Sequence, residues 1–411
     1  MAEKKGLKEY LRSGSNSSVL LGAGLLMAVS AIGPGFFTQT TRFTEQQQGG
    51  FASVIVVATI FVLVAQLNVW RIIAVSQKRG QDVANAILPG LGHLVAFLVA
   101  FGGLAFNIGN IAGAAMGIQV ITGLEVRYGA IIVGILGVII FYSKKVGLVV
   151  DRFSQVTGAL MLILIGYAAV ASRPPVGQAI TGIVTPFLEG TFPFMAVLTI
   201  IGGTVGGYIT FSGAHRLVDA GLVGTENLKR VTNSSIMGVS VATLIRILLF
   251  LGALGTVITH GVTLDPSNPA RTVFETAGGQ VGLIIFGVVF FSESLNSVVG
   301  AAYTSVSFLK TLFKPIGKHE NWVIIGFILA SALILIILDR NPVTILILAG
   351  SLNGLILPIT LGTILIASKR KDIVGDYKHP MWLLIAGVVV VLVTAYFGVN
   401  SARGIAQLWQ S

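Results

Sequence analysis

The stretch Ser30-Ala-Ile-Gly-Pro-Gly-Phe-Phe-Thr-Gln-Thr-Thr41 follows an apolar run, Val19-Leu-Leu-Gly-Ala-Gly-Leu-Leu-Met-Ala-Val29, that is typical of the first half of a membrane-spanning helix. Proline lacks a backbone donor and clashes with the preceding turn, whereas glycine tolerates unwound geometry. In hydrocarbon a freed backbone group is costly unless protein or water satisfies it. The stretch therefore predicts either an irregularity that neighbouring helices repair or the wall of a binding site.

A second interruption follows later in the chain, in Ile200-Ile-Gly-Gly-Thr-Val-Gly-Gly-Tyr-Ile-Thr-Phe-Ser-Gly213. The glycines between Gly202 and Gly207 are hard to reconcile with a continuous helix, since each costs about 1 kcal/mol. Small residues also permit close contact between helices, which is an alternative explanation. Paired Gly/Pro breaks in the two halves of a membrane protein are the sequence mark of a transporter's binding site. The pair therefore favours the binding-site interpretation.

The composition identifies a membrane protein. Hydrophobic residues make up 54% of the 411 and charged residues only 10%, against roughly 25% charged in a soluble domain. The chain contains no cysteine, which excludes disulfides, thiol catalysis and cysteine-based metal sites. No Ser/His/Asp or paired-carboxylate pattern indicates catalysis, so we expect a protein that is not an enzyme and that needs no cofactor.

The sequence contains eleven apolar spans, which we place at approximately 20–42, 51–75, 92–122, 128–143, 153–172, 193–215, 233–259, 280–309, 321–338, 342–367 and 381–400. With the N-terminus in the cytoplasm, twenty of the 27 Lys and Arg residues fall in cytoplasmic segments or near the cytoplasmic ends of spans, and six fall on the outside in the same way. Only Arg246, in the middle of a span, is left over. This asymmetry follows the positive-inside rule and predicts a cytoplasmic N-terminus and an outside C-terminus. The net charge of +11 is then explained by topology and by contact with the lipid bilayer, and nucleic-acid binding is not expected.

We expect one transmembrane domain over residues 1–411, in the plasma (inner) membrane of a bacterium. It consists of two five-helix repeats, about 20–172 and 193–367, and an extra helix at about 381–400. An odd number of helices per repeat inverts the second repeat in the membrane, and the two breaks then occupy corresponding positions in spans 1 and 6. The oligomeric state stays open.

Several further motifs carry a family resemblance that extends over nearly the whole chain. They are Gly80-Gln-Asp-Val-Ala84, Gly113-Ala-Ala-Met-Gly117, Ser292-Glu-Ser-Leu-Asn-Ser-Val-Val-Gly-Ala-Ala-Tyr303, and Leu355-Ile-Leu-Pro-Ile359 followed by Ser368-Lys-Arg-Lys-Asp-Ile-Val-Gly-Asp-Tyr-Lys-His-Pro380. In these motifs the chain resembles the Nramp family of divalent-metal transporters. The resemblance implies an all-α LeuT-type fold of two inverted repeats in which helices 1 and 6 are broken.

The sequence departs from the family pattern at the metal ligands. Family members bind the metal through an Asp and an Asn of the first helix and a Met of the sixth. The resemblance places Gly33, Phe36 and Gly206 at those positions, with Gly207 and Tyr208 in place of a Pro and a His.

The family's acidic pair in the third helix, which is associated with proton movement, falls on Asn107 and Asn110. We therefore expect transport without proton coupling. Without methionine, a preference for soft transition metals has no chemical basis. Neutral oxygen donors suit a partly hydrated Mg²⁺ better than Mn²⁺, and a magnesium-transporting branch of the family points the same way.

The candidate residues for substrate binding surround the two breaks and the third span. They are Gly33, Gly35, Phe36, Thr38, Gln39, Thr40, Asn107, Asn110, Thr204, Gly206 and Tyr208. Those expected to offer oxygen to a metal ion are Thr38, Gln39, Asn107, Asn110 and Tyr208.

Arg246 lies in the middle of the seventh span, and intramembrane charges face a cavity or a partner. We expect a buried ion pair with Glu293, the carboxylate that lies deep in another span. Alternatively, Arg246 stands in for a coupling cation, which would favour a small neutral or anionic solute. A transporter-like receptor that moves no substrate is a further alternative.

Overall fold

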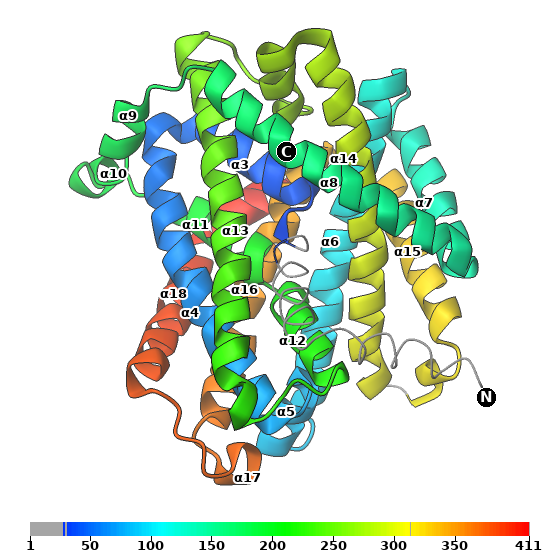
Figure 1. Ribbon diagram of the computed structural model, residues 1–411, viewed down its shortest axis with the longest axis vertical. Coiled ribbons are helices and arrows are strands. Elements are labelled where there is room, and N and C mark those ends of the chain that lie inside the picture. Colours follow the sequence, from blue (N-terminus) through cyan, green and yellow to red (C-terminus); the bar gives the residue numbers. More distant parts are fainter. Residues whose placement is uncertain (1–27, 29–30, 313, 411) are drawn as a thin grey trace.

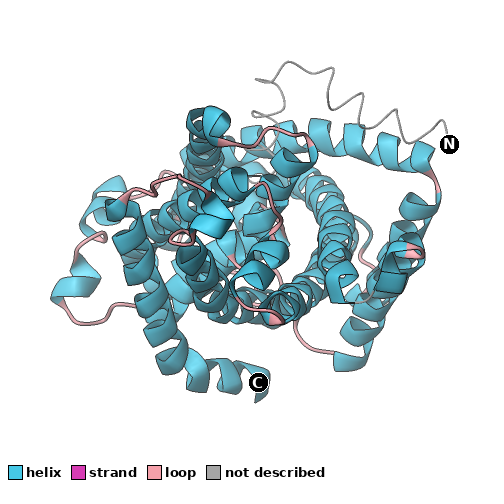
Figure 2. Ribbon diagram, turned by 90° about the horizontal axis from the view of Figure 1, so that it is seen from below, coloured by secondary structure: helices cyan, strands magenta, loops and turns pink. Residues whose placement is uncertain are grey.

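The computed structural model describes residues 28, 31–312 and 314–410, and these residues form an all-helical bundle without strands (Figures 1 and 2). Eight helical stretches in this part of the chain are long and apolar enough to cross a membrane, and shorter apolar helices cover 126–142 and 156–171. Long apolar helices satisfy their own backbone hydrogen bonds, which is what a lipid environment requires.

The helices follow the predicted spans closely. They are α3 (Pro34–Gln47), α4 (Phe51–Ser76), α5 (Gly80–Ile87), α6 (Leu91–Thr122), α7 (Val126–Tyr142), α8 (Lys144–Ala171), α9 (Val176–Thr181), α10 (Thr185–Leu188), α11 (Phe194–Val205), α12 (Ile209–Asp219), α13 (Leu228–Leu254), α14 (Pro269–Leu312), α15 (Glu320–Leu338), α16 (Pro342–Ala367), α17 (Lys371–Val374) and α18 (Met381–Gln410). Each of the eleven predicted spans has its helix, although most of the first half of span 1 lies outside the described residues.

The largest difference from the predicted spans is at α14. The sequence predicts a loop up to residue 279, but the helix already begins at Pro269 and bends at Gly279, which has a φ of 57°. The early start has a packing reason. Phe274 is fully buried and stacks on Phe286 with ring centroids 4.7 Å apart. The local sequence does not predict this helical turn, because turn-forming residues precede it and the stabilising apolar contact is with a residue beyond the kink.

The centre of the bundle is built on close backbone contacts between helices. A Cβ atom added at Gly202 of α11 would collide with the backbone of Gly350 and Gly354 in α16. Likewise, a Cβ atom at Gly117 of α6 would lie 2.6 Å from the backbone nitrogen of Phe291 in α14. These glycines bring the four helices into direct contact around the broken segments.

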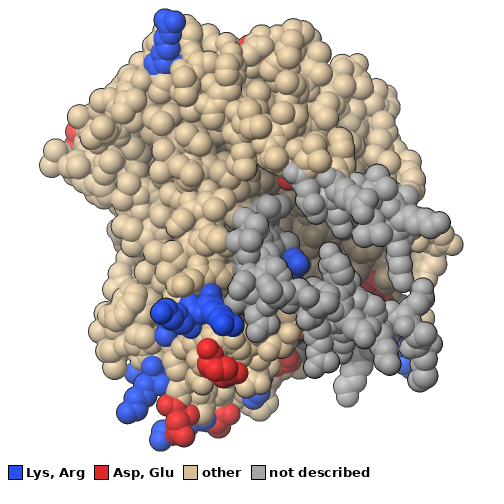
Figure 3. Space-filling view, viewed as in Figure 1, with Lys and Arg blue, Asp and Glu red and all other residues tan. Residues whose placement is uncertain are grey.

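The outer surface separates apolar and charged residues. Many large apolar side chains are exposed around the bundle, among them Ile135, Ile163 and Leu392, as expected of a surface that faces lipid. On the face shown in Figure 3, Lys and Arg side chains gather toward the end that carries α5 and α17, and few lie at the opposite end.

Candidate functional site

The first break lies directly before α3. The backbone N–H of Ile32 donates to the carbonyl of Ala28 at 3.0 Å, and Gly33 is then extended, with φ −91° and ψ −174°. Pro34 opens α3, where its missing donor and fixed φ suit the first turn. The predicted interruption of this span is therefore confirmed, and α3 begins with its N-terminus at the break.

The second break separates α11 from α12. Helix α11 ends at Val205, Gly206 is extended (φ −74°, ψ 154°), and Gly207 has a φ of +54°. This left-handed conformation is one that glycine adopts without steric cost. The two explanations of the glycine run both apply here, because Gly202 provides close packing and Gly206 and Gly207 provide the break.

Helices α3 and α11, which border the two breaks, are in buried contact. The Gln39 side chain lies against α11, where a Cβ atom added at Gly203 would be 2.5 Å from Gln39 Oε1. The amide nitrogen of Gln39 donates to the carbonyl of Leu346 in α16 at 2.9 Å. Gln39 Oε1 has no hydrogen-bond partner among the described residues.

Arg246 of α13 connects the two breaks. Its Nη1 donates to Thr204 Oγ1 at 3.1 Å, and its guanidinium carbon lies 4.3 Å from the centroid of the Phe36 ring. The residue is only 5% exposed, and within the described part of the chain Nε and Nη2 have no hydrogen-bond partner.

The predicted ion pair between Arg246 and Glu293 is wrong. Among the described residues no ion pair joins them, and Glu293 instead accepts a hydrogen bond from Thr157 Oγ1 at 3.3 Å. The reason is local. Glu293 is directed toward α8, where a Cβ atom at Gly158 would lie 3.3 Å from its Oε1, and Arg246 is directed toward Phe36 and Thr204.

The opposite side of the site is formed by α6 and the start of α12. A Cβ atom at Gly33 would lie 3.6 Å from Asn110 Oδ1 and 3.5 Å from Ser297 Oγ. The Tyr208 ring meets the Phe106 ring of α6 edge-on, with ring centroids 5.8 Å apart. Within the described residues, Asn110 Nδ2 has no partner.

The structure brings together most of the predicted residues, but not all of them. Gly33, Phe36, Asn110, Thr204 and Tyr208 meet at the breaks as described above. Asn107 is directed elsewhere, because its Nδ2 donates to Ser331 Oγ of α15 at 3.0 Å.

The remaining candidates lie along α3 and α11. Gly35 is in the first turn of α3 beside the Gln39 amide, and Gly206 packs on Asn353 of α16. Thr38 and Thr40 are fully buried, and their hydroxyl oxygens have no partner within the described residues.

Sequence reasoning missed Ser297 and Asn353 as neighbours of the breaks. The Nδ2 of Asn353 donates to the carbonyls of Gly102 and Ala349 at 3.0 and 2.8 Å. Its Oδ1 faces Gly207 and has no partner within the described part of the chain. The available signal was a polar amide inside an otherwise apolar span.

The chemistry of the site is that of neutral polar groups and one cation. In the residues that the structure describes, no group of three or more His, Asp or Glu side chains could hold a metal ion. The groups left for a ligand are hydroxyl and amide atoms, the exposed backbone of the breaks, and the guanidinium of Arg246.

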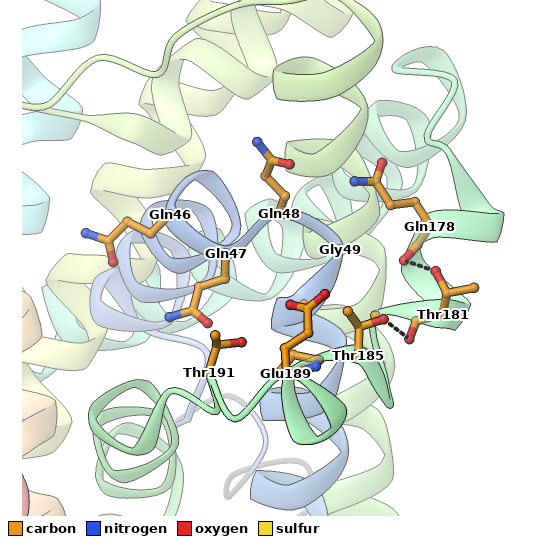
Figure 4. Close-up of a pocket in the computed structure, with 12 residues that line it drawn as sticks. Gln46, Gln47, Gln48, Gly49, Gln178, Thr181, Thr185, Glu189 and Thr191 are labelled. Carbon is orange, nitrogen blue, oxygen red and sulfur yellow. Dashed lines mark hydrogen bonds between the residues drawn. The ribbon is translucent and has the colours of Figure 1, made fainter.

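A separate recess of about 550 Å³ opens at the far end of α3, between η1 (Gln48–Gly50) and the helices α9 and α10. Figure 4 shows the amide side chains of Gln46, Gln47, Gln48 and Gln178 around it, together with the carboxylate of Glu189. Because α3 has 14 residues, the recess is about 20 Å along the helix from the first break. It is a surface vestibule, distinct from the buried site.

Residues 24–402 of the chain match the family described as Natural resistance-associated macrophage protein-like (Nramp). The chain is 51% identical to the membrane protein YcsG of Bacillus subtilis, over 95% of this chain and 96% of that protein. It is 23% identical to the divalent metal cation transporter MntH of Deinococcus radiodurans, over 92% of this chain and 88% of that protein.

Among solved structures, a manganese transporter of Eremococcus coleocola in complex with an aromatic bis-isothiourea substituted compound has the same fold. The TM-score is 0.74 at 16% identity, and the match covers 98% of this chain and 89% of that one. This likeness confirms the predicted LeuT-type architecture.

Proposed function

The chain belongs to the Nramp family, and on that premise we propose that it is a secondary transporter whose cargo binds between the break before α3 and the break between α11 and α12. The observation that supports this is the pairing of the two breaks around buried polar atoms that have no partner among the described residues. Broken helices of this kind expose backbone to a substrate in transporters of several folds. Transport, not catalysis, is the activity that such a site serves.

The first candidate cargo is a divalent cation, with Mg²⁺ preferred over Mn²⁺. The relatives support a divalent metal, since they include a divalent metal cation transporter and a manganese transporter. The preference for Mg²⁺ rests on donor chemistry. The oxygens around the breaks come from neutral amides and hydroxyls, which suit a hard ion that keeps part of its water shell.

We further propose that transport does not exchange protons. Asn110 and Asn107 carry amides where the family resemblance places acids, and an amide does not titrate in water. The measurement is acidification of the lumen of proteoliposomes during substrate uptake. Proton flux that depends on substrate would show that another group, with Glu293 the first suspect, carries the proton.

The second candidate cargo is a small neutral or anionic solute, and the observation that favours it is Arg246. A dication beside a buried guanidinium and without a carboxylate is poorly compensated. A neutral or negative solute meets no such repulsion.

The test of transport is a flux panel on the purified protein in liposomes, with Mg²⁺, Mn²⁺, Ca²⁺ and small organic solutes. We expect saturable uptake of one class and none by protein-free liposomes. Absence of uptake with every substrate, from protein that remains folded, would favour the transporter-like receptor instead.

Gly33→Asp separates the two cargo classes. If the site accepts cations, the new carboxylate should raise the affinity for Mg²⁺ or Mn²⁺ by about tenfold, which corresponds to about 1.4 kcal/mol. If the cargo is neutral or anionic, the same carboxylate should abolish its transport and yield no metal binding. Isothermal titration of wild type and variant with both metals distinguishes these outcomes, and no heat in any titration counts against a cation.

We propose an orientation in a bacterial plasma membrane with the N-terminus in the cytoplasm and the C-terminus outside. The support is the asymmetric distribution of Lys and Arg, which gather toward the end that carries α5 and α17 (Figure 3). Labelling of single cysteines from outside intact cells tests it, and the natural chain provides a background without cysteine.

A further inference from the structure

We propose that Arg246 binds the carboxylate of a small organic anion between the two breaks. This proposal deepens the second cargo candidate, and it rests on the proposed function of the breaks as the transport site. Four features of the structure support it: the free edge of the guanidinium, its burial, the helix N-termini beside it, and the neutral polar groups opposite.

The free edge of Arg246 has the geometry that a carboxylate requires. Nη1 is used by Thr204, whereas Nε and Nη2 have no partner among the described residues. In a planar guanidinium the Nε–H and one Nη2–H point in the same direction. This side-on pair of donors matches the two oxygens of a carboxylate and forms parallel, charge-assisted hydrogen bonds.

The burial of Arg246 shows that a partner is needed. The side chain is 5% exposed, and taking a cation out of water is costly unless it is paired and hydrogen-bonded. The Phe36 ring below the guanidinium and the Thr204 hydroxyl offset part of that cost. Within the described part of the chain no carboxylate supplies the rest, since Glu293 is bonded to Thr157 instead.

Two helix N-termini add positive potential at the same place. Helix α3, with 14 residues, and helix α12, with 11, both begin at the breaks. Each N-terminus carries a partial positive charge and free backbone N–H groups that favour an anion. Phe36, whose ring lies against the guanidinium, is in the first turn of α3. The guanidinium and the N-terminus of α3 therefore border the same part of the site.

Other buried polar atoms around the breaks indicate what the rest of the solute is like. Asn110 Nδ2 and Gln39 Oε1 are a buried donor and a buried acceptor without partners in the described residues. A solute with a short polar body next to its carboxylate could satisfy both amides, whereas a long apolar tail would leave them unpaired.

The first test needs no variant. Thermal unfolding of the purified full chain is measured with the sodium salts of acetate, lactate and succinate, and with acetamide, lactamide and succinamide as uncharged analogues. We expect at least one carboxylate to raise the unfolding temperature and its amide to leave it unchanged. Stabilisation by inorganic phosphate alone would overturn the assignment to a carboxylate.

The second test removes the guanidinium. Arg246→Gln should weaken binding of the stabilising carboxylate by about a hundredfold, because a buried charged partner is lost. Arg246→Lys keeps the positive charge but not the paired donors. Its affinity for the carboxylate should therefore lie between those of wild type and Arg246→Gln. Arg271→Gln is the matched control. Arg271 is a partly exposed residue of α14 that forms an ion pair with Glu275, and binding by this variant should equal that of wild type.

Uptake of radiolabelled lactate and succinate into proteoliposomes completes the test. Uptake by wild type that is lost in Arg246→Gln supports the proposal. Uptake of Mg²⁺ or Mn²⁺ with no binding of any carboxylate would overturn it and leave the transport function standing. Absence of carboxylate binding together with absence of all uptake would overturn both.

Discussion

The two breaks interrupt their helices in different ways, and the difference concerns how much freedom each has to change. At the first break, Gly33 is extended, and an added Cβ atom would meet Ser297 and Asn110 only at ordinary contact distances of 3.5 and 3.6 Å. At the second, Gly207 has a positive φ, and an added Cβ atom would collide with Asn353. Steric constraints therefore require glycine at the second break, whereas position 33 at the first break has room for a side chain.

This contrast explains how the side chains at a break can vary in a chain that keeps a family's fold. The first break accepts a side chain without a change of backbone, so its chemistry can vary. The packing of α11 on α16 at Gly202 does not allow such variation. If the proposed site is correct, the choice of cargo depends on the first break and on Arg246, whereas the fold depends on the second break.

The largest expected effect is that of Gly202→Ala. The added methyl group would collide with backbone atoms of Gly350 and Gly354, which cannot move without displacing α16. We expect a loss of stability above about 3 kcal/mol and little monodisperse protein on size-exclusion chromatography. The control is Gly362→Ala, which lies on α16, the helix that Gly202 of α11 contacts, but has no atom within 4 Å of the added Cβ. This variant should be at least as stable as wild type.

The second prediction tests the comparison directly with the same substitution at each break. Gly207→Ala should lower the stability by about 2 kcal/mol, since it combines a left-handed backbone with a contact to Asn353. Gly33→Ala should stay within about 0.5 kcal/mol of wild type. Thermal unfolding in detergent measures both, and equal losses at the two positions would contradict the distinction that we draw.

The third prediction concerns Arg246, the residue that we propose binds an anion. Arg246→Met replaces a buried and incompletely paired cation with an apolar side chain of similar length. We expect the variant to be as stable as wild type or more stable by about 1 kcal/mol, because removal of poorly paired buried charge is often neutral or favourable. A marked drop in unfolding temperature would instead give Arg246 a structural role.

The sequence predicted the helical architecture and both breaks, because apolar length and the local effects of glycine and proline determine them. The positions of Gly33, Gly206 and Gly207 needed no knowledge of tertiary contacts. The early start of α14 escaped prediction because it depends on Phe274 stacking on Phe286, a contact with the far side of a kink.

The partners of the buried charges could not be predicted from sequence. Arg246 and Glu293 both lie deep in apolar spans, and complementary charge alone favours a pair. Which way each side chain points depends on the rotation of its helix in the bundle, and packing of α8 and α14 turns Glu293 toward Thr157. For the same reason Asn107 turns to α15, although it lies only one helical turn from Asn110.

The smallest expected effect on stability comes from a polar network near α18 whose side chains are hydrogen-bonded to one another. It serves as a comparison for the unpaired polar atoms at the breaks. His379, before α18, lies 2.9 Å from Asn68 Oδ1 through Nε2 and 3.3 Å from the Tyr377 hydroxyl through Nδ1. Burial, aided by the charges of Arg71 and Lys369, lowers its pKa from 6.5 to about 4. The folded state therefore keeps this imidazole neutral where the unfolded chain would take up a proton. The contribution of His379 to stability should be constant above pH 6.5, fall as the pH drops from 6.5 to about 4, and level off below that. Unfolding temperatures across this range check it, and His379→Gln should remove part of the slope while the exposed His93→Gln leaves it intact. An unchanged slope in His379→Gln would assign the pH dependence to other groups.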